Sequence, residues 1–108
     1  MTFRQMLVIL IIAGCMWQAI FCAFDYVYAS ECVYENDLQY IRCCESRDRY
    51  HIVNDAGTHF GGYQFDLPTW YSVGGVGYPH EAAPEEQDYR AAILYSLRGR
   101  DPWKSCLA

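Results

Sequence analysis

The sequence has few basic residues. Lysine and arginine together number 8, against 13 aspartates and glutamates, and the formal net charge is −5. The basic residues form no stripe or cluster along the 108-residue chain. Nucleic-acid binding is therefore not expected, because contacts to phosphates need such a surface. Binding to an anionic polymer would have to depend on a local site rather than on overall charge.

Motifs for metals and phosphates are also missing. The three histidines, His51, His59 and His80, lack the spacing of metal ligands, and there is no Cys-x-x-Cys pair. No glycine-rich phosphate loop, internal repeat or low-complexity tract is present. We therefore expect neither a metal nor a cofactor.

The N-terminal segment has the composition of a targeting sequence. Arg4 precedes an uncharged run from Met6 to Phe24, and the small-residue motif Val27-Tyr28-Ala29 follows. This order is typical of a secretory signal peptide, so we expect residues 1–29 to be cleaved.

Two other interpretations of this N-terminal segment remain. The run is just long enough for an uncleaved membrane anchor, which we rank second. Ile12-Ala13-Gly14-Cys15 also resembles a bacterial lipobox, in which Cys15 would be lipidated, and we rank this third. All three readings place the domain outside the cytoplasm.

Four cysteines follow this segment, at positions 32, 43, 44 and 106. An even number in a short exported chain implies disulfides, and four cysteines allow three pairings. Adjacent Cys43 and Cys44 are unsuited to bond each other. A bond between Cys44 and Cys106 would close most of the domain, an effect of roughly 4 kcal/mol. Cys32 and Cys43 would then form the remaining pair, or stay reduced. So small a domain needs such a staple, because it buries little apolar surface.

A first helix is expected after a short lead-in at residues 30–36. Asn36 or Asp37 can cap it. One face carries, at helical spacing, Leu38, Ile41 and Glu45. The polar bend at residues 47–49 ends the helix, which places Glu45 near its C-terminus beside an apolar stripe.

The sequence predicts that the middle of the chain consists of loops on either side of a second helix. Residues 50–60 form a loop that turns at residues 54–57. Residues 61–65, Gly-Gly-Tyr-Gln-Phe, read as a short extended segment. Asp66 can cap a short helix with Pro68 in its first turn. The glycines of residues 73–81 predict another loop.

A third helix begins near Pro84, with Glu85 and Glu86 in its first turn, where the helix dipole favours acids. Gly99 closes it, and residues 101–106 return to the first helix. We expect its apolar face to consist of Tyr89, Ala92, Ile93 and Leu97. The fold class is therefore α+β, mostly helical, with a short β segment.

The order of several motifs resembles a known family. These motifs are Cys44-Glu45-Ser46, Gly61-Gly62-Tyr63-Gln64-Phe65, Leu67-Pro68-Thr69-Trp70, Gly77-Tyr78-Pro79-His80, Glu85-Glu86-Gln87 and Trp103-Lys104-Ser105-Cys106. Their order resembles the transglycosylase-like domain of the resuscitation-promoting factors of actinobacteria, a small relative of lysozyme and of soluble lytic transglycosylases. The resemblance runs roughly from Asp37 to Cys106. It implies a disulfide-stapled, lysozyme-like domain over residues 37–108.

The resemblance also implies roles for particular residues. The family's catalytic glutamate follows the helix cysteine, which implies Glu45. The same cysteine bonds the last one of the family's closing Trp-x-x-Cys, which implies a Cys44–Cys106 disulfide. The Gly-Gly-x-Gln-Phe segment borders the family's saccharide cleft, so Gln64 and Thr69 become expected substrate contacts.

One departure concerns the four residues after Ser46. The family usually has Gly-Gly-Asn-Trp there, whereas this chain has Arg47-Asp48-Arg49-Tyr50. We expect two charged side chains beside the cleft, where the family has small residues.

Aromatic residues make up 17% of the sequence, and their faces suit packing against sugar rings. Four could form a stacking platform: Tyr50, Phe60, Tyr63 and Trp70. We expect most of them in the core, with Tyr63 the best candidate for exposure. Tyr50 and Tyr63 join Gln64 and Thr69 as predicted substrate contacts.

A carboxylic acid at position 45 suits glycosidic bond cleavage, because the leaving oxygen must be protonated as the bond breaks. Burial and the helix C-terminus would raise the pKa of Glu45, and a nearby Arg47 or Arg49 would lower it. A retaining hydrolase needs a second carboxylate roughly 5 Å away. The candidates are Asp48, Asp55 and Asp66, although Asp66 is more simply a helix cap.

A lytic transglycosylase needs one carboxyl group only. We therefore predict that the chain cuts the β-1,4 bond between N-acetylmuramic acid and N-acetylglucosamine, with Glu45 as acid and then base. A hydrolytic muramidase and a non-catalytic peptidoglycan-binding module are the alternatives. We expect a secreted monomer at the cell wall that contacts glycan strands, and membrane association only through an uncleaved N-terminal segment.

Overall fold

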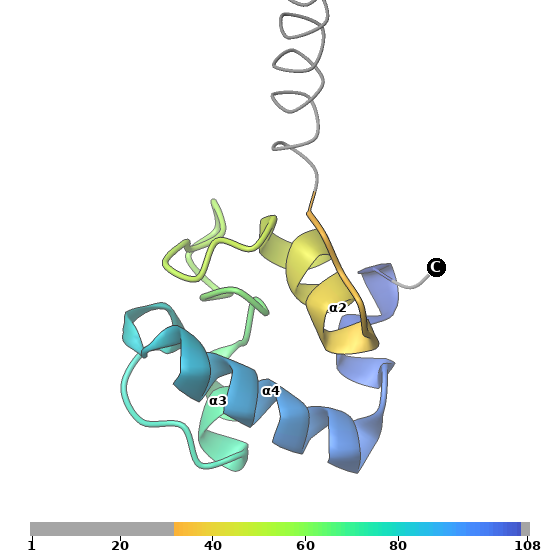
Figure 1. The fold of residues 1–108 in the computed structure, drawn as a ribbon. Helices are drawn as coiled ribbons and strands as arrows, with labels where there is room; N and C mark the ends of the chain where they lie inside the picture. The colour runs from red at the N-terminus through yellow and green to blue at the C-terminus, as the bar shows by residue number, and fades with distance from the viewer. Residues whose placement is uncertain (1–31, 107–108) are drawn as a thin grey trace, which may run out of the picture. The chain divides into compact units, whose positions relative to one another are not determined.

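We describe the fold from a computed structural model, which describes residues 32–106. Its helices are α2 (Asp37–Ser46), α3 (Leu67–Ser72), the 3-10 helix η1 (Pro79–Glu81), α4 (Pro84–Arg98) and the 3-10 helix η2 (Asp101–Cys106) (Figure 1). The predicted targeting segment, residues 1–29, lies outside the described residues. Across residues 32–106 none of the helices has both the length and the apolar character needed to span a bilayer.

Helix α2 forms where its capping residues predict it. The Asn36 side chain accepts a hydrogen bond from the Gln39 N–H at 3.0 Å, which satisfies one of the free donors at the start of the helix. Ile41 is fully buried, and Leu38 packs beside it against the core. At the other end Arg47 adopts a left-handed conformation, and its N–H donates to the Cys43 carbonyl at 2.7 Å.

Residues 61–65 form a tight turn, so the prediction of an extended segment was wrong. Phe60 and Phe65 exchange two backbone hydrogen bonds of 2.9 Å, and the chain reverses between them. Gly61 makes the turn possible with φ +81°, and a Cβ there would overlap Oε1 of Gln87. Within residues 32–106, β structure consists of two isolated bridges. The predicted class, mostly helical α+β, is confirmed.

The side chain of Gln87 holds this turn against α4. It is fully buried. Its Oε1 accepts from the Gly62 N–H at 2.9 Å, and its Nε2 donates to the carbonyls of Tyr50 and Ala82 at 3.1 and 2.9 Å. A buried amide with its groups paired in this way stabilises one arrangement of three separate segments.

Helix α4 has the predicted ends, but of its predicted apolar face only Ile93 packs against the core, and the other three residues are exposed. The buried residues are Gln87, Ala91 and Leu94. Tyr89 is 58% exposed and Leu97 71% exposed. The core-facing positions follow the helical spacing i, i+4, i+7 from the polar Gln87. Because that residue is buried for its hydrogen bonds, counting apolar residues selects the wrong face.

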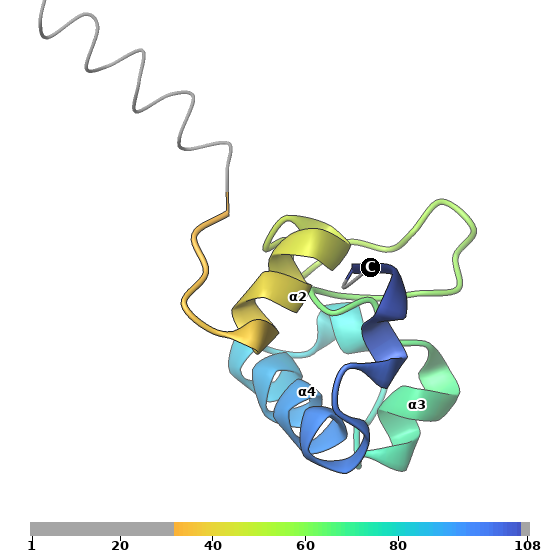
Figure 2. The same ribbon diagram turned by 90° about the vertical axis from the view of Figure 1, so that its right-hand side faces the viewer.

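The core lies between α2, α3, α4 and the turn at residues 61–65. It comprises Ile41, Tyr63, Phe65, Trp70, Val73, Ala91, Leu94 and Trp103. Helix η2 contacts α2 and, as Figure 2 shows, runs back past α4 toward the end of α2. The indole N–H of Trp103 donates to the buried carbonyl of Tyr63 at 3.0 Å. The C-terminal return predicted from the sequence is therefore fixed to the turn as well as to α2.

Candidate active site

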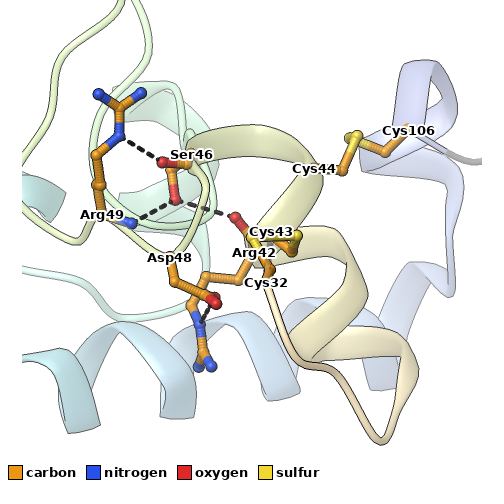
Figure 3. The surroundings of a disulfide bond; sticks show 8 residues. All are labelled: Cys32, Arg42, Cys43, Cys44, Ser46, Asp48, Arg49 and Cys106. Carbon is orange, nitrogen blue, oxygen red and sulfur yellow. Dashed lines mark hydrogen bonds and ion pairs between the residues drawn. A yellow bond between two sulfur atoms is a disulfide. The ribbon is translucent and has the colours of Figure 1, made fainter. Parts of the chain in front are cut away.

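Two disulfides leave α2 from consecutive residues. Cys32 is bonded to Cys43 and Cys44 to Cys106, with Cα–Cα distances of 5.5 and 5.7 Å. Both are the pairings that the sequence predicted. Figure 3 shows the two bonds leaving the helix in different directions, one toward the lead-in and one toward η2. The second bond fixes η2 directly beside the last turn of α2, where Glu45 lies.

The carboxyl group of Glu45 is half-buried and lies against this disulfide. Its Oε1 is 3.1 Å from the Cys106 sulfur. That sulfur carries no hydrogen, because it is bonded to Cys44, so the contact is not a proton-donating hydrogen bond. Among residues 32–106, no N–H or O–H group donates to this carboxyl group. Burial raises the pKa of Glu45, and the opposing attraction comes from His59 rather than from Arg47 or Arg49.

A small pocket opens near Glu45. Its lining residues are His59, Gln64, Phe65, Asp66, Thr69, Leu94, Pro102 and Trp103. Two predicted substrate contacts, Gln64 and Thr69, are thus brought together. Glu45 is not part of the lining. Two connections link it to the pocket: His59 acts electrostatically on both Glu45 and the pocket residue Asp66, and η2 supplies Trp103 to the pocket and Cys106 to Glu45.

The pocket residues Gln64 and Asp66 are both held in place by hydrogen bonds to the backbone. Gln64 has φ +52° at the end of the turn, and its Nε2 donates to the Gly61 carbonyl at 2.8 Å. Asp66 caps α3 as predicted and accepts from the Thr69 N–H at 2.8 Å. Hydrogen bonds from Thr69 lower the pKa of Asp66, so this carboxylate is ionised at neutral pH.

The other carboxylate candidates lie away from the pocket. Asp48 accepts from Nε of Arg42 at 2.7 Å, and this ion pair holds the bend after α2. Asp55 is exposed in the loop after residue 53. Of the three, Asp66 alone lines the pocket.

Tyr63 is buried, so the expectation of an exposed sugar-stacking platform there was wrong. Its side chain is 1% exposed, and its hydroxyl donates to Asp88 at 2.7 Å. The half-buried Tyr50 also donates to Asp88, at 2.9 Å, and its ring lies below the Arg42 guanidinium at 5.1 Å. Burial and the Asp88 carboxylate raise the pKa of Tyr50 to about 12. The two tyrosines belong to a cluster that joins α2 to α4.

Of the charged residues after Ser46, the exposed Arg49 bonds back to the end of α2. Nε of Arg49 donates to the Ser46 carbonyl at 2.8 Å, as Figure 3 shows. Arg47 is exposed. Arg47 and Asp48 both have positive φ, +54° and +59°, in the two positions where the resemblance led us to expect glycine.

Sequence reasoning missed His59 and Gln87 as parts of this region. In the sequence, His59 was considered only as a possible metal ligand, and Gln87 only as part of a family motif. The available signal for His59 was the polar run from Asn54 to Thr58, whose side chains are suited to closing a turn. Within the described part of the chain, no group of three or more His, Cys, Asp and Glu side chains is placed to hold a metal ion.

Comparison with known proteins identifies the family of this chain. The model of the transglycosylase-like domain matches residues 33–106. The chain belongs to the transglycosylase-like domain family. This match covers the whole described domain, and its small helical fold with two disulfides is that of a lysozyme-like domain.

Individual relatives of this transglycosylase-like domain are resuscitation-promoting factors. The chain is 46% identical over 63 residues to Rpf of Micrococcus luteus, covering 58% of this chain and 28% of that protein. It is 36% identical to RpfC of Mycobacterium tuberculosis over 63 residues, covering 58% and 44%. It is 34% identical to RpfD of the same species over 70 residues, covering 65% and 45%. The chain therefore spans less than half the length of these relatives.

Proposed function

We propose that the domain is a peptidoglycan lytic transglycosylase in which Glu45 is the catalytic acid and then the base. One observation carries the proposal: a half-buried carboxyl group whose pKa burial raises is linked through His59 and η2 to a pocket, and it receives no hydrogen bond from residues 32–106. Such a group retains its proton to higher pH than a solvated glutamate, as an acid for glycosidic cleavage requires. Membership of the transglycosylase-like domain family supports the choice of substrate.

The proposed reaction uses one carboxyl group twice. Glu45 donates its proton to the oxygen that bridges N-acetylmuramic acid and N-acetylglucosamine, and the bond to the muramic C1 breaks. The resulting carboxylate then takes the proton of the C6 hydroxyl on the same muramic acid residue. The C6 oxygen bonds to C1 and closes a 1,6-anhydro ring, a reaction favoured because both atoms belong to one sugar. We propose that Gln64 and Thr69 contact the sugar, and that Tyr50 and Tyr63 support the site from behind.

A hydrolytic muramidase is the second candidate, and Asp66 is the observation that favours it. This carboxylate lines the pocket and its pKa is lowered, so it could activate a water molecule while Glu45 protonates the leaving oxygen. Its hydrogen bond to the Thr69 N–H gives it a structural task as well. The products distinguish the two reactions.

The deciding experiment is mass spectrometry of peptidoglycan digested by the purified protein. Anhydro-ended fragments support the transglycosylase, and reducing ends support the muramidase. Glu45→Gln should lower the rate by about 10²–10⁴-fold, because it removes a general acid. Glu85→Gln, at an exposed position in α4, is the matched control and should keep full activity. Unchanged cleavage by Glu45→Gln would exclude Glu45, and binding to insoluble peptidoglycan without any fragments would identify a binding module.

Thermal unfolding of Glu45→Gln separates loss of chemistry from loss of folding. The pKa of Glu45 is raised in the folded state, so wild-type stability falls as pH rises through the interval between the unfolded and folded values. Glutamine does not titrate. The Tm of the variant minus the Tm of wild type should therefore increase between acidic pH and pH 7. This increase should disappear below pH 4.5, the ordinary pKa of a glutamate.

We also propose that the domain works outside the cytoplasm at the cell wall, as a monomer. The order of Arg4, the uncharged run and Val27-Tyr28-Ala29 supports export, and two disulfides suit an oxidising compartment. Mass spectrometry of the exported protein tests this: a chain that begins at Ser30 supports cleavage. An intact leader or a lipid on Cys15 would support the two alternatives.

A further inference from the structure

We propose that His59 is a saccharide-binding residue whose Nε2–H group donates a hydrogen bond to an acetamido carbonyl oxygen in the pocket beside Glu45. The proposal rests on the proposed function in taking a glycan strand as the occupant of the pocket. It is carried by three features of the structure: the place of His59 in the pocket wall, the hydrogen bonds that favour one tautomer, and the acceptors that face it.

The loop that carries His59 is held by one side chain, that of Asn54. Oδ1 of Asn54 accepts from the backbone N–H groups of Thr58 and His59 at 2.7 and 2.9 Å. The backbone N–H of Asn54 donates to the His59 carbonyl at 3.0 Å, and its carbonyl accepts from Gly57 at 2.9 Å. An exposed loop with this many internal bonds presents His59 from a defined position.

The neighbours of Nδ1 favour one tautomer of His59. Because Oδ1 of Asn54 accepts two N–H groups, Nδ2 is the amide atom that faces Thr58 and the ring. It donates to Oγ1 of Thr58 at 3.0 Å and lies 3.3 Å from Nδ1 of His59, while Oγ1 of Thr58 is 2.9 Å from the same Nδ1. The Asn54 amide nitrogen is a donor only, whereas the Thr58 hydroxyl can donate or accept, so this arrangement favours an Nδ1 that accepts and a neutral ring with its hydrogen on Nε2.

Among the polar lining residues of the pocket, side-chain donors come from His59, from Thr69 and from the second N–H of Gln64 Nε2, whose first N–H is bonded to the Gly61 carbonyl. The acceptors among the same lining residues are the carboxylate of Asp66 and Oε1 of Gln64. A sugar with an acetamido group offers both a donor N–H and an acceptor carbonyl. The acceptors on one side of the pocket can take the N–H, and the Nε2–H of His59 provides the partner for the carbonyl.

His59 also links the pocket to the acid. The charged groups it acts on are Glu45 at the end of α2 and Asp66 at the start of α3, and Arg98 of α4 acts on the same Asp66. When His59 is protonated, its positive charge lowers the pKa of Glu45. Removing that charge should let the pKa of Glu45 rise, so the loss of activity at high pH should begin at a higher pH.

Two substitutions at this position separate the donor from the charge. His59→Leu removes both, whereas His59→Gln keeps a donor near the place of Nε2 and removes the charge. Binding is measured by calorimetry with a soluble tetrasaccharide of alternating N-acetylglucosamine and N-acetylmuramic acid, in the Glu45→Gln background, so that no cleavage occurs. We expect Kd to rise about tenfold for the leucine variant and by no more than about twofold for the glutamine variant.

In the Glu45-containing enzyme, both substitutions should move the basic limb of the pH profile of kcat/KM to higher pH. Unchanged binding by the leucine variant, or an equal loss by the glutamine variant, would overturn the assignment of His59. ¹⁵N NMR of the imidazole offers a readout that is independent of activity: the Nε2–H tautomer is expected, and Nδ1–H would contradict the proposal. If the Glu45→Gln protein with His59 intact binds no saccharide, the proposed function and this inference fail together; binding that is indifferent to position 59 overturns the inference alone.

Discussion

Two residues at the end of α2 hold a backbone conformation that side chains disfavour. Arg47 and Asp48 have φ +54° and +59°, a region that costs an L-residue about 1–2 kcal/mol and glycine little. The family pattern that the sequence resembles has glycines in these positions. The backbone strain at Asp48 is offset by the ion pair in which its carboxylate accepts from Nε of Arg42 at 2.7 Å. Within residues 32–106, the exposed Arg47 side chain makes no hydrogen bond, so its backbone strain has no such offset.

Arg47→Gly should therefore stabilise the domain. We expect the free energy of unfolding to rise by about 0.5–1 kcal/mol, because glycine relieves the left-handed strain. Arg47→Ala is the matched control: it removes the same side chain but keeps a Cβ, so it should give no gain. Urea unfolding of the three proteins measures the difference. A similar gain in the alanine variant would show that the side chain, and not the backbone, is responsible.

The acid and its surroundings were only partly predictable at this scale. Glu45 and Gln64 were predicted as site residues because motif order marks them, and Gln64 lies in the pocket lining. Tyr63 was misjudged because its burial depends on partners far along the chain: its hydroxyl donates to Asp88 of α4, and its ring lies 6.4 Å from that of Trp103. His59 was missed because its position depends on how Asn54 closes a loop, and a single histidine in a sequence does not show its neighbours.

Helix boundaries were the most predictable feature at the scale of elements. Asn36, Asp66 and Pro84 begin α2, α3 and α4, since caps and proline act locally. The face that a helix buries depends instead on distant partners. In α4 that face is centred on Gln87, whose hydrogen bonds reach Gly62, Tyr50 and Ala82, and none of these contacts is visible in the local pattern.

Two leucines of α4 test this corrected orientation. Leu94 is 2% exposed and Leu97 is 71% exposed. Leu94→Ala should lower the free energy of unfolding by about 3 kcal/mol, because it leaves a cavity in the core. Leu97→Ala replaces the same residue type in the same helix, and it should alter the free energy of unfolding by less than about 0.5 kcal/mol. If chemical unfolding shows that both variants lose the same free energy of unfolding, the orientation of α4 described here would be contradicted.

The two disulfides constrain the whole molecule to different extents. The Cys44–Cys106 pair has a sequence separation of 62 residues and the Cys32–Cys43 pair one of 11. The first bond also fixes η2, which contributes Pro102 and Trp103 to the pocket lining and Cys106 to the contact with Glu45. The second ties the lead-in to α2. Their removal should therefore affect stability to a similar degree but activity differently.

Replacing each pair by serine separates these effects. Loop closure predicts a loss of about 4 kcal/mol for Cys44→Ser/Cys106→Ser and of about 3 kcal/mol for Cys32→Ser/Cys43→Ser. At a temperature where both variants remain folded, the first should also lose most of its glycan-cleaving activity and the second should keep it. Unfolding curves and initial rates on peptidoglycan provide the measurements. Full activity in the first variant would mean that η2 stays in place without its covalent bond.

The adjacency of Cys43 and Cys44 has a mechanical consequence. Cys32, near the start of the domain, and Cys106, near its end, are bonded to neighbouring residues of one helix. A stretching force applied at residues 32 and 106 is transmitted through two sulfur bridges and one peptide bond, and bypasses the intervening chain. The domain would therefore resist extension covalently while both bridges are oxidised, and a force probe should detect unfolding only after reduction.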